Sequence, residues 1–196
     1  MLARTHLHAV LLVLAAAGAT RASAAGGSIS GKVDVTPAKY LGETVVYLES
    51  VPGTYAPRTL QMDQQGMQFV PHLLVVTAGD TVRFLNHDGV AHNVYSPDGE
   101  AYNLGAFKGG EARTQLFAKP GAYSQLCSIH PEMLGWVFVA QNPYAAAVDD
   151  KGRYELRDVP AGTYQLKVWN AHLPGTSRSV TVAAGAATAA DLSVHR

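Results

Sequence analysis

From residue 28 onward, apolar and polar residues alternate with a period of two in short runs. Such alternation is typical of β-strands that bury one of their two faces. Turn-forming groups separate the runs, among them Pro97-Asp98-Gly99, Pro120-Gly121 and Pro160-Ala161-Gly162. No segment after residue 28 keeps an apolar stripe at helical spacing together with a convincing cap. The sequence therefore predicts an all-β chain built from β-sandwiches.

The strand pattern also predicts how the chain divides into domains. The strands expected at 29–35 and 44–49 share the clean amphipathic character of about four strands expected after residue 145. Those later strands alone would make a marginal core. We therefore expect one discontinuous β-sandwich made of residues 25–56 and 142–196, with a second sandwich, residues 57–141, inserted into it. Two consecutive domains or one large sandwich are the alternatives.

The first 24 residues have the pattern of a secretory signal peptide. Arg4 supplies a short cationic start, residues 9–18 form an apolar run, and Ala22-Ser23-Ala24 is a small-residue cleavage pattern. The apolar run is too short to span a bilayer, and no later stretch approaches about 18 uninterrupted apolar residues. We expect residues 1–24 to be removed, a periplasmic or secreted location and no membrane insertion of the mature chain. An N-terminal anchor helix is the alternative.

The charge balance and the cysteine count exclude several classes of protein. Lys+Arg and Asp+Glu both number 15 in 196 residues, so no basic surface indicates nucleic-acid binding. A single cysteine, Cys127, excludes an intrachain disulfide and any multi-cysteine zinc or iron–sulfur site. In an oxidising compartment, an unpaired thiol is unusual unless it is buried or ligated. The role of Cys127 is therefore the central question.

Cys127 lies in a short loop between two expected strands. The loop carries Cys127, His130 and Met133 in a C-x2-H-x2-M spacing, and His92 begins an upstream strand with the parity of the apolar Val94. Two loops at one end of a sandwich can bring these four side chains together. A thiolate, two imidazoles and a distant thioether suit copper in both of its oxidation states. The pattern therefore predicts a copper site.

Three alternatives to a copper site fit these residues less well. Taken singly, Cys127 and Met133 are most often core residues, and the two histidines are most often loop or half-buried polar residues. Structural zinc normally has four strong ligands and no thioether. A cysteine–histidine nucleophile pair would need a third orienting group and an oxyanion turn, and neither is evident in this loop. We therefore expect no catalytic residues and no enzyme activity.

Several motifs occur in a fixed order along residues 57–141. They are Phe69-Val70-Pro71, Leu74-Val75-Val76, Ala78-Gly79-Asp80-Thr81-Val82, Asn86, His92-Asn93-Val94 and Cys127-Ser128-Ile129-His130-Pro131-Glu132-Met133. In this order they resemble the cupredoxins of the plastocyanin, amicyanin and pseudoazurin group. The ligand spacing with Pro131 is closest to the short amicyanin-type loop.

The resemblance implies a fold, a cofactor and a function. It implies a Greek-key cupredoxin β-sandwich that holds one type 1 copper ion through His92, Cys127, His130 and Met133. The implied function is electron transport by a plastocyanin-like carrier. Copper storage, delivery or sensing is the alternative that uses the same ligands, and a structural surface protein with a vestigial site is a third.

The resemblance also implies roles for residues around the copper ligands. The side chain of Asn93 is expected to tie its loop to Ser128 beside the thiolate. His130 is implied to be the partly exposed ligand at which electrons enter. Pro131 and Leu134, with Met133, are then part of an apolar patch where a redox partner protein docks.

Three further polar residues lie near these motifs. His72 and His87 lie in expected loops, and we expect both to face solvent, with His87 the more plausible additional metal ligand. Gln125 precedes Cys127 by two residues on the same strand face, where an apolar residue would be expected. It either forms a hydrogen bond near the site or faces another domain.

Motifs on both sides of the central segment suggest a second family. They are Gly27-Ser28-Ile29-Ser30-Gly31-Lys32-Val33, Asp149-Asp150-Lys151-Gly152-Arg153-Tyr154 and Val159-Pro160-Ala161-Gly162-Thr163-Tyr164. They resemble a carboxypeptidase regulatory-like (prealbumin-type) domain, which implies a structural or adhesive module without a catalytic group. The combination of the two modules is similar to proteins labelled methylamine utilisation-like. That label does not imply methylamine chemistry.

Overall fold

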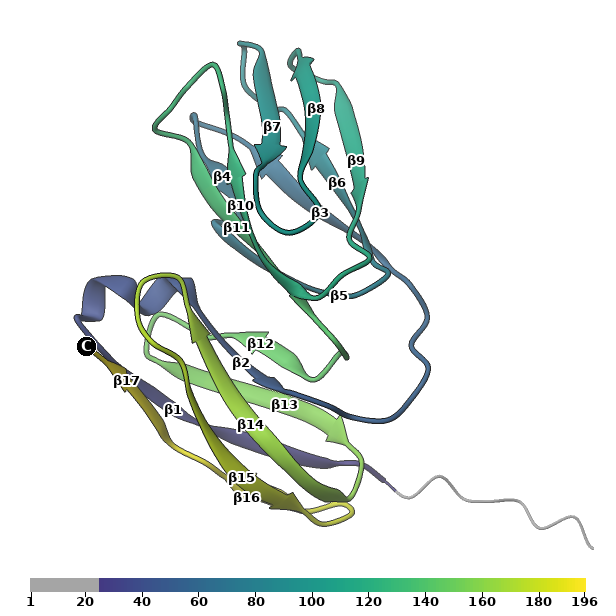
Figure 1. The fold of residues 1–196 in the computed structure, drawn as a ribbon, viewed down its shortest axis with the longest axis vertical. Helices are drawn as coiled ribbons and strands as arrows, with labels where there is room; N and C mark the ends of the chain where they lie inside the picture. The colour runs from purple at the N-terminus through teal and green to yellow at the C-terminus, as the bar shows by residue number, and fades with distance from the viewer. Residues whose placement is uncertain (1–24) are drawn as a thin grey trace, which may run out of the picture.

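The computed structural model describes residues 25–196. The predicted signal peptide, residues 1–24, lies outside the described residues. Within the described part of the chain, strands dominate and the one helix is the short 3-10 helix η1 (Ala38–Glu43). None of the described residues form a helix that is long and apolar enough to cross a membrane. The predicted all-β fold class is confirmed (Figure 1).

Two sheets form one β-sandwich, which we call the flanking sandwich. In one sheet β1 pairs with β13, β16 and β17, and the other has the order β12-β2-β14-β15. Both ends of the described chain contribute to it (Figure 1). Its strands are β1 (Gly27–Thr36), β2 (Thr44–Leu48), β12 (Ala145–Ala147), β13 (Arg153–Val159), β14 (Gly162–Asn170), β15 (Thr176–Val182), β16 (Ala187–Ala189) and β17 (Leu192–His195).

The other two sheets form a second β-sandwich, the central sandwich. Their strand orders are β5-β11-β10-β7-β8 and β4-β3-β6-β9. A buried apolar cluster with members from both sheets is its core. Its strands are β3 (Thr59–Gln64), β4 (Phe69–Val70), β5 (Leu73–Thr77), β6 (Thr81–Leu85), β7 (His92–Ser96), β8 (Tyr102–Phe107), β9 (Ala112–Leu116), β10 (Gly121–Leu126) and β11 (Leu134–Ala140).

Strand pairing separates the two sandwiches along the chain. Strands β3–β11 pair among themselves, and β1, β2 and β12–β17 pair among themselves. The predicted boundaries at 56/57 and 141/142 fall in the two segments that connect the sandwiches, and they stay a prediction. The alternating pattern missed β12 and β16, because three residues are too few to show a period of two.

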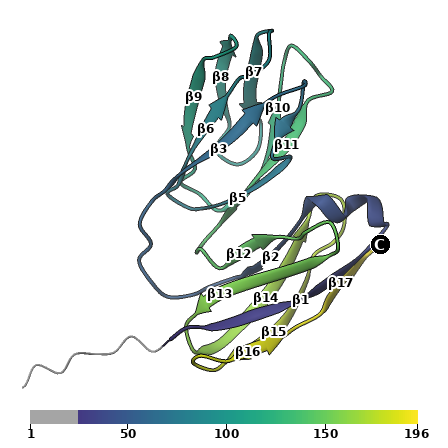
Figure 2. The ribbon, with the colours of Figure 1, turned by 180° about the vertical axis from the view of Figure 1, so that it is seen from behind.

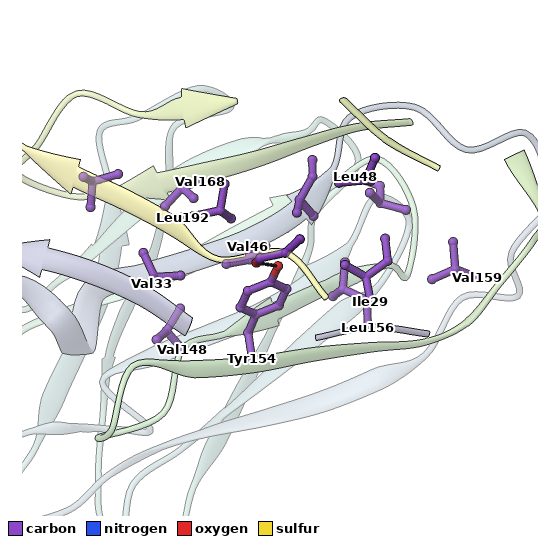
Figure 3. Close-up of a cluster of buried hydrophobic side chains, with 14 of the residues drawn as sticks. Ile29, Val33, Val46, Leu48, Val148, Tyr154, Leu156, Val159, Val168 and Leu192 are labelled. Atoms are coloured by element: carbon purple, nitrogen blue, oxygen red, sulfur yellow. Dashed lines mark hydrogen bonds between the residues drawn. The ribbon is translucent and has the colours of Figure 1, made fainter. Parts of the chain in front are cut away.

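The core of the flanking sandwich shows why the alternating pattern predicts its strands. Ile29 and Val33 of β1 lie in the same buried cluster as Tyr154 and Leu156 of the neighbouring strand β13 (Figure 3). The Tyr154 hydroxyl donates a hydrogen bond of 2.5 Å to the Ala190 carbonyl. Burial raises the pKa of Tyr154 to about 12. This buried hydroxyl is therefore satisfied within the core.

The two sandwiches contact one another through a third apolar cluster. Its aromatic members include Trp136 and Phe138 of β11 and Trp169 of β14. The Trp169 ring centroid lies 5.5 Å from that of Trp136 and 5.3 Å from that of Phe138. In both views β5 and β11 are the central strands next to the flanking sandwich (Figures 1 and 2). The contact leaves the opposite end of the central sandwich uncovered.

Candidate metal centre

Three of the predicted metal ligands meet at one end of the central sandwich. His92 begins β7, Cys127 follows the last residue of β10, and His130 lies in the loop between β10 and β11. One potential ligand atom from each residue lies within 4.8 Å of the other two. His130 Nδ1 is 3.0 Å from His92 Nδ1 and 3.8 Å from Cys127 Sγ. Two nitrogens and one sulfur therefore converge on one point.

Local structure explains how these side chains reach the same place. His92 and Val94 are both buried, although they differ in character, because they share the inward parity of β7. β7 pairs antiparallel with β10 through Tyr95 and Leu126, so the start of β7 runs beside the loop that follows β10. The ligand loop therefore lies next to His92.

Met133 lies on the buried side of the ligand loop. The Met133 N–H donates a 3.0 Å hydrogen bond to the His130 carbonyl, which closes a turn. Its side chain is 1% exposed and belongs to the same core cluster as Cys127. His130, by contrast, is half-buried. The centre therefore has an apolar floor and one ligand at the protein surface.

Asn93 connects the two loops of the centre. Its backbone N–H points to Cys127 Sγ at 3.4 Å. Its side-chain oxygen accepts hydrogen bonds from Ser128 N (3.3 Å) and Ser128 Oγ (3.0 Å). Its side-chain nitrogen donates to Asn103 Oδ1 at 2.8 Å. Asn103 was not identified from the sequence, because nothing in the local pattern marks it.

Asp88 is a second residue that the sequence analysis missed. Its Oδ2 lies 2.7 Å from His92 Nε2 and accepts a hydrogen bond from Met67 N (2.9 Å), and its Oδ1 accepts one from Gly66 N (2.6 Å). These backbone hydrogen bonds, strongest from Met67, and the bond to His92 lower the pKa of Asp88. The carboxylate therefore holds the proton of His92 on Nε2 and leaves Nδ1 free to bind a metal. The i, i+4 spacing of Asp88 and His92 was the available signal.

Gln125 takes part in a polar network inside the central sandwich. The side chain is fully buried, accepts a hydrogen bond from the Tyr102 hydroxyl, and donates one of 3.0 Å to the Tyr123 carbonyl. Burial raises the pKa of Tyr102. Gln125 therefore forms hydrogen bonds with two tyrosines, and neither tyrosine is a predicted metal ligand.

The two additional histidines do not join the centre. His87 Nδ1 lies 2.5 Å from Asp63 Oδ2, and the ring is exposed. His72 Nε2 lies 2.6 Å from Oε1 of Glu43, a residue of the flanking sandwich. His72 is exposed, as expected from the sequence, and the second sandwich supplies its carboxylate partner.

The surface around His130 contains exposed apolar side chains. Two residues of the predicted docking patch lie here: Pro131 is exposed and Leu134 is half-buried. Ile129, from the same loop, and Val90, from the loop before His92, are also exposed. The sequence analysis did not single out these last two residues, because exposure of an apolar loop residue depends on the fold.

Two family models match parts of this chain. The family described as copper binding proteins, plastocyanin/azurin family, matches residues 57–140. Polysaccharide lyase family 4, domain II, an fn3-like family, matches residues 119–190. The matches overlap at β10 and β11, which pair within the central sandwich. The second match therefore supports a further β-sandwich from β12 onward, under another family name than the expected carboxypeptidase regulatory-like domain.

Solved structures of amicyanin and of a purple cupredoxin are similar to part of this chain. A reduced amicyanin mutant is 30% identical, over 41% of this chain and 81% of amicyanin, with a TM-score of 0.39. A Cu(I) form of another amicyanin mutant is 29% identical, with the same coverage and TM-score. A purple cupredoxin from Nitrosopumilus maritimus is 28% identical, over 41% of this chain and 99% of that protein, with a TM-score of 0.38.

Proposed function

Through residues 57–140, this chain belongs to the plastocyanin/azurin family of copper-binding proteins. From this we propose that it carries electrons through a single type 1 copper ion. One observation carries the proposal: the Cys127 sulfur and a nitrogen from each of His92 and His130 lie within 4.8 Å of one another. Copper held by these residues would supply one-electron chemistry between Cu(II) and Cu(I).

The donor set fits copper better than other metals. Cys127 offers a soft thiolate, and His92 and His130 offer neutral imidazoles, so both oxidation states find suitable ligands. Met133 is buried in the same core cluster as Cys127 and is proposed as the weak fourth ligand. A thioether in the fourth position disfavours structural zinc, which takes four strong ligands. The residues that are present therefore fit a type 1 site.

Neighbouring residues hold the ligands in place before any metal binds. Asp88 orients the His92 ring, and Asn93 joins the His92 loop to Ser128 next to Cys127. Ligands fixed by such contacts change position little between oxidation states, which favours fast electron transfer. The proposed role is electron carriage without catalysis of a substrate reaction.

His130 is the proposed point at which electrons enter and leave. It is the half-buried member of the cluster, whereas His92 and Cys127 are buried. The exposed Pro131 and the half-buried Leu134 lie in the same segment and offer apolar contact area to a redox partner protein. We place this exchange in the periplasm or outside the cell, after removal of residues 1–24.

Visible and electron paramagnetic resonance (EPR) spectra of residues 25–196 with one equivalent of Cu(II) test the proposal. We expect an intense visible band from charge transfer between Cys127 and copper. Cys127→Ser is the control, and it abolishes the band. Colourless Cu(II) bound to a chain with reduced Cys127 would contradict the type 1 assignment. Fast electron self-exchange with slow metal release is expected of a carrier, and rapid copper transfer to an acceptor would instead indicate delivery.

A further inference from the structure

A second group of metal-binding side chains lies where the two sandwiches meet. It consists of Glu43, the last residue of η1, His72 between β4 and β5, and His172 between β14 and β15. We call it the junction cluster. In both views η1 lies on the side of the flanking sandwich that faces the central sandwich (Figures 1 and 2). The proposed copper centre uses none of these residues.

One carboxylate in the junction cluster is shared by two imidazoles. His72 Nε2 lies 2.6 Å from Glu43 Oε1, and His172 Nε2 contacts Glu43 Oε2. The side chain of Glu43 is 15% exposed, whereas His72 is 47% and His172 36% exposed. The two imidazole nitrogens therefore face the carboxylate from the two different sandwiches, in a place that solvent ions can reach.

Both oxygens of that carboxylate contact an imidazole. Glu43 Oε2 is buried, and His172 Nε2 lies against it. The carboxylate and the two imidazole nitrogens therefore form one continuous group of potential metal-ligand atoms across the two sandwiches.

The backbone around the cluster is well anchored. The His72 carbonyl accepts a 2.7 Å hydrogen bond from Trp136 N, and His172 N donates one of 2.9 Å to Asn170 Oδ1. The His172 ring stacks on Tyr40, with 4.3 Å between the ring centroids. These contacts anchor the two histidines without using the atoms that a metal would need.

We propose that the junction cluster binds one divalent cation, of the kind represented by Zn²⁺ and Cu²⁺. Two imidazole nitrogens and a carboxylate are a ligand set that these ions take. Because each nitrogen faces its own carboxylate oxygen, the cluster is wider than the candidate metal centre. An ion held by these three side chains would link the central to the flanking sandwich.

Zinc titration by isothermal calorimetry tests the proposal. The starting protein is Cys127→Ser/His130→Gln, which lacks two of the proposed copper ligands, and we expect it to bind one Zn²⁺ per chain. Adding Glu43→Gln or His172→Gln is expected to weaken zinc binding about tenfold or more. His87→Gln is the matched control, because its ring faces a single carboxylate without a second imidazole, and it leaves binding unchanged. Absence of zinc binding, or binding that both junction substitutions leave intact, would overturn the proposal.

A second measurement keeps the copper ligands intact. EPR spectra of the unsubstituted chain with two equivalents of Cu(II) are expected to show a second Cu(II) signal without thiolate absorption. That signal is expected to disappear in His172→Gln, while the Cys127-dependent band stays. Its persistence in His172→Gln would overturn the junction site and leave the proposed electron-transfer function untouched. Absence of the Cys127-dependent band, with the second Cu(II) signal present, would overturn the proposed electron-transfer function and leave the junction site untouched.

Discussion

Asp88 Oδ2 lies 2.7 Å from His92 Nε2, so the fully buried imidazole has a carboxylate on the side that faces away from Cys127 and His130. The same carboxylate accepts two backbone hydrogen bonds from the turn at Gly66 and Met67. The orientation of a proposed metal ligand therefore depends on a turn of the opposite sheet.

We expect Asp88→Ala to weaken copper binding about 10- to 100-fold, because His92 loses the contact that sets its ring orientation and tautomer. Competition with a copper chelator of known affinity measures the change. Asp63→Ala is the control, since Asp63 also pairs with a histidine, His87, but lies outside the ligand cluster. Equal affinities of the Asp88→Ala variant and the unsubstituted chain would show that Asp88 has no positioning role.

Met133→Gln is expected to keep the intense visible band and to lower the reduction potential. The band arises from Cys127, whereas the weak fourth ligand tunes the relative stability of Cu(I) and Cu(II). An oxygen donor in place of the thioether favours Cu(II). Spectroelectrochemical titration gives the potential. An unchanged potential would mean that Met133 acts only as a buried core residue.

Asn93→Ala is expected to destabilise the metal-free chain by about 1–3 kcal/mol, because it leaves buried hydrogen-bonding groups without partners. The variant loses the side-chain bonds to Ser128 and Asn103 but keeps the backbone N–H near Cys127. Urea unfolding measures the free energy. Ser128→Ala, which removes one of these bonds at an exposed residue, is expected to cost less. A larger loss in Ser128→Ala would contradict this order.

Asp80 is expected to make the stability of the chain dependent on pH in acid. Burial opposes ionisation of Asp80, but hydrogen bonds from the Arg58 side chain and from Thr77 N and Arg58 N outweigh it and lower its pKa. Because the folded pKa lies below the unfolded value of about 3.9, the stabilisation is complete above that value. It is lost as the pH falls through the folded pKa.

Asp80→Asn tests this linkage. We expect a loss of about 1–3 kcal/mol in the free energy of unfolding at pH 7, and a smaller difference from the unsubstituted chain near pH 3. Urea unfolding at both pH values gives the comparison. A difference that stays constant between pH 7 and pH 3 would rule out the ionised carboxylate as the source of the stabilisation.

The candidate metal centre shows how much of a site the local sequence can predict. Cys127, His130 and Met133 share one short loop, so their spacing alone indicated a common site. His92 was predicted to join this site because it points to the same side of its strand as the apolar Val94. Asp88 was missed, because whether a loop carboxylate meets a histidine depends on the turn that holds it.

The junction cluster illustrates the opposite case. Glu43, His72 and His172 lie in different segments, and no local pattern connects them. The sequence also left two possible roles for Gln125, because its hydrogen-bond partners Tyr102 and Tyr123 are set by the packing of the core.

The sequence by itself determined the all-β class and the residues of the ligand loop, because alternation and loop spacing are local properties of the chain. The tertiary structure decided which side chains complete each site. Asp88 reaches His92, and Glu43 reaches His72 and His172, only after strands distant in sequence have paired and the two sandwiches have packed together. Those contacts depend on register and packing between whole sheets, which arise from the summed burial of many apolar side chains.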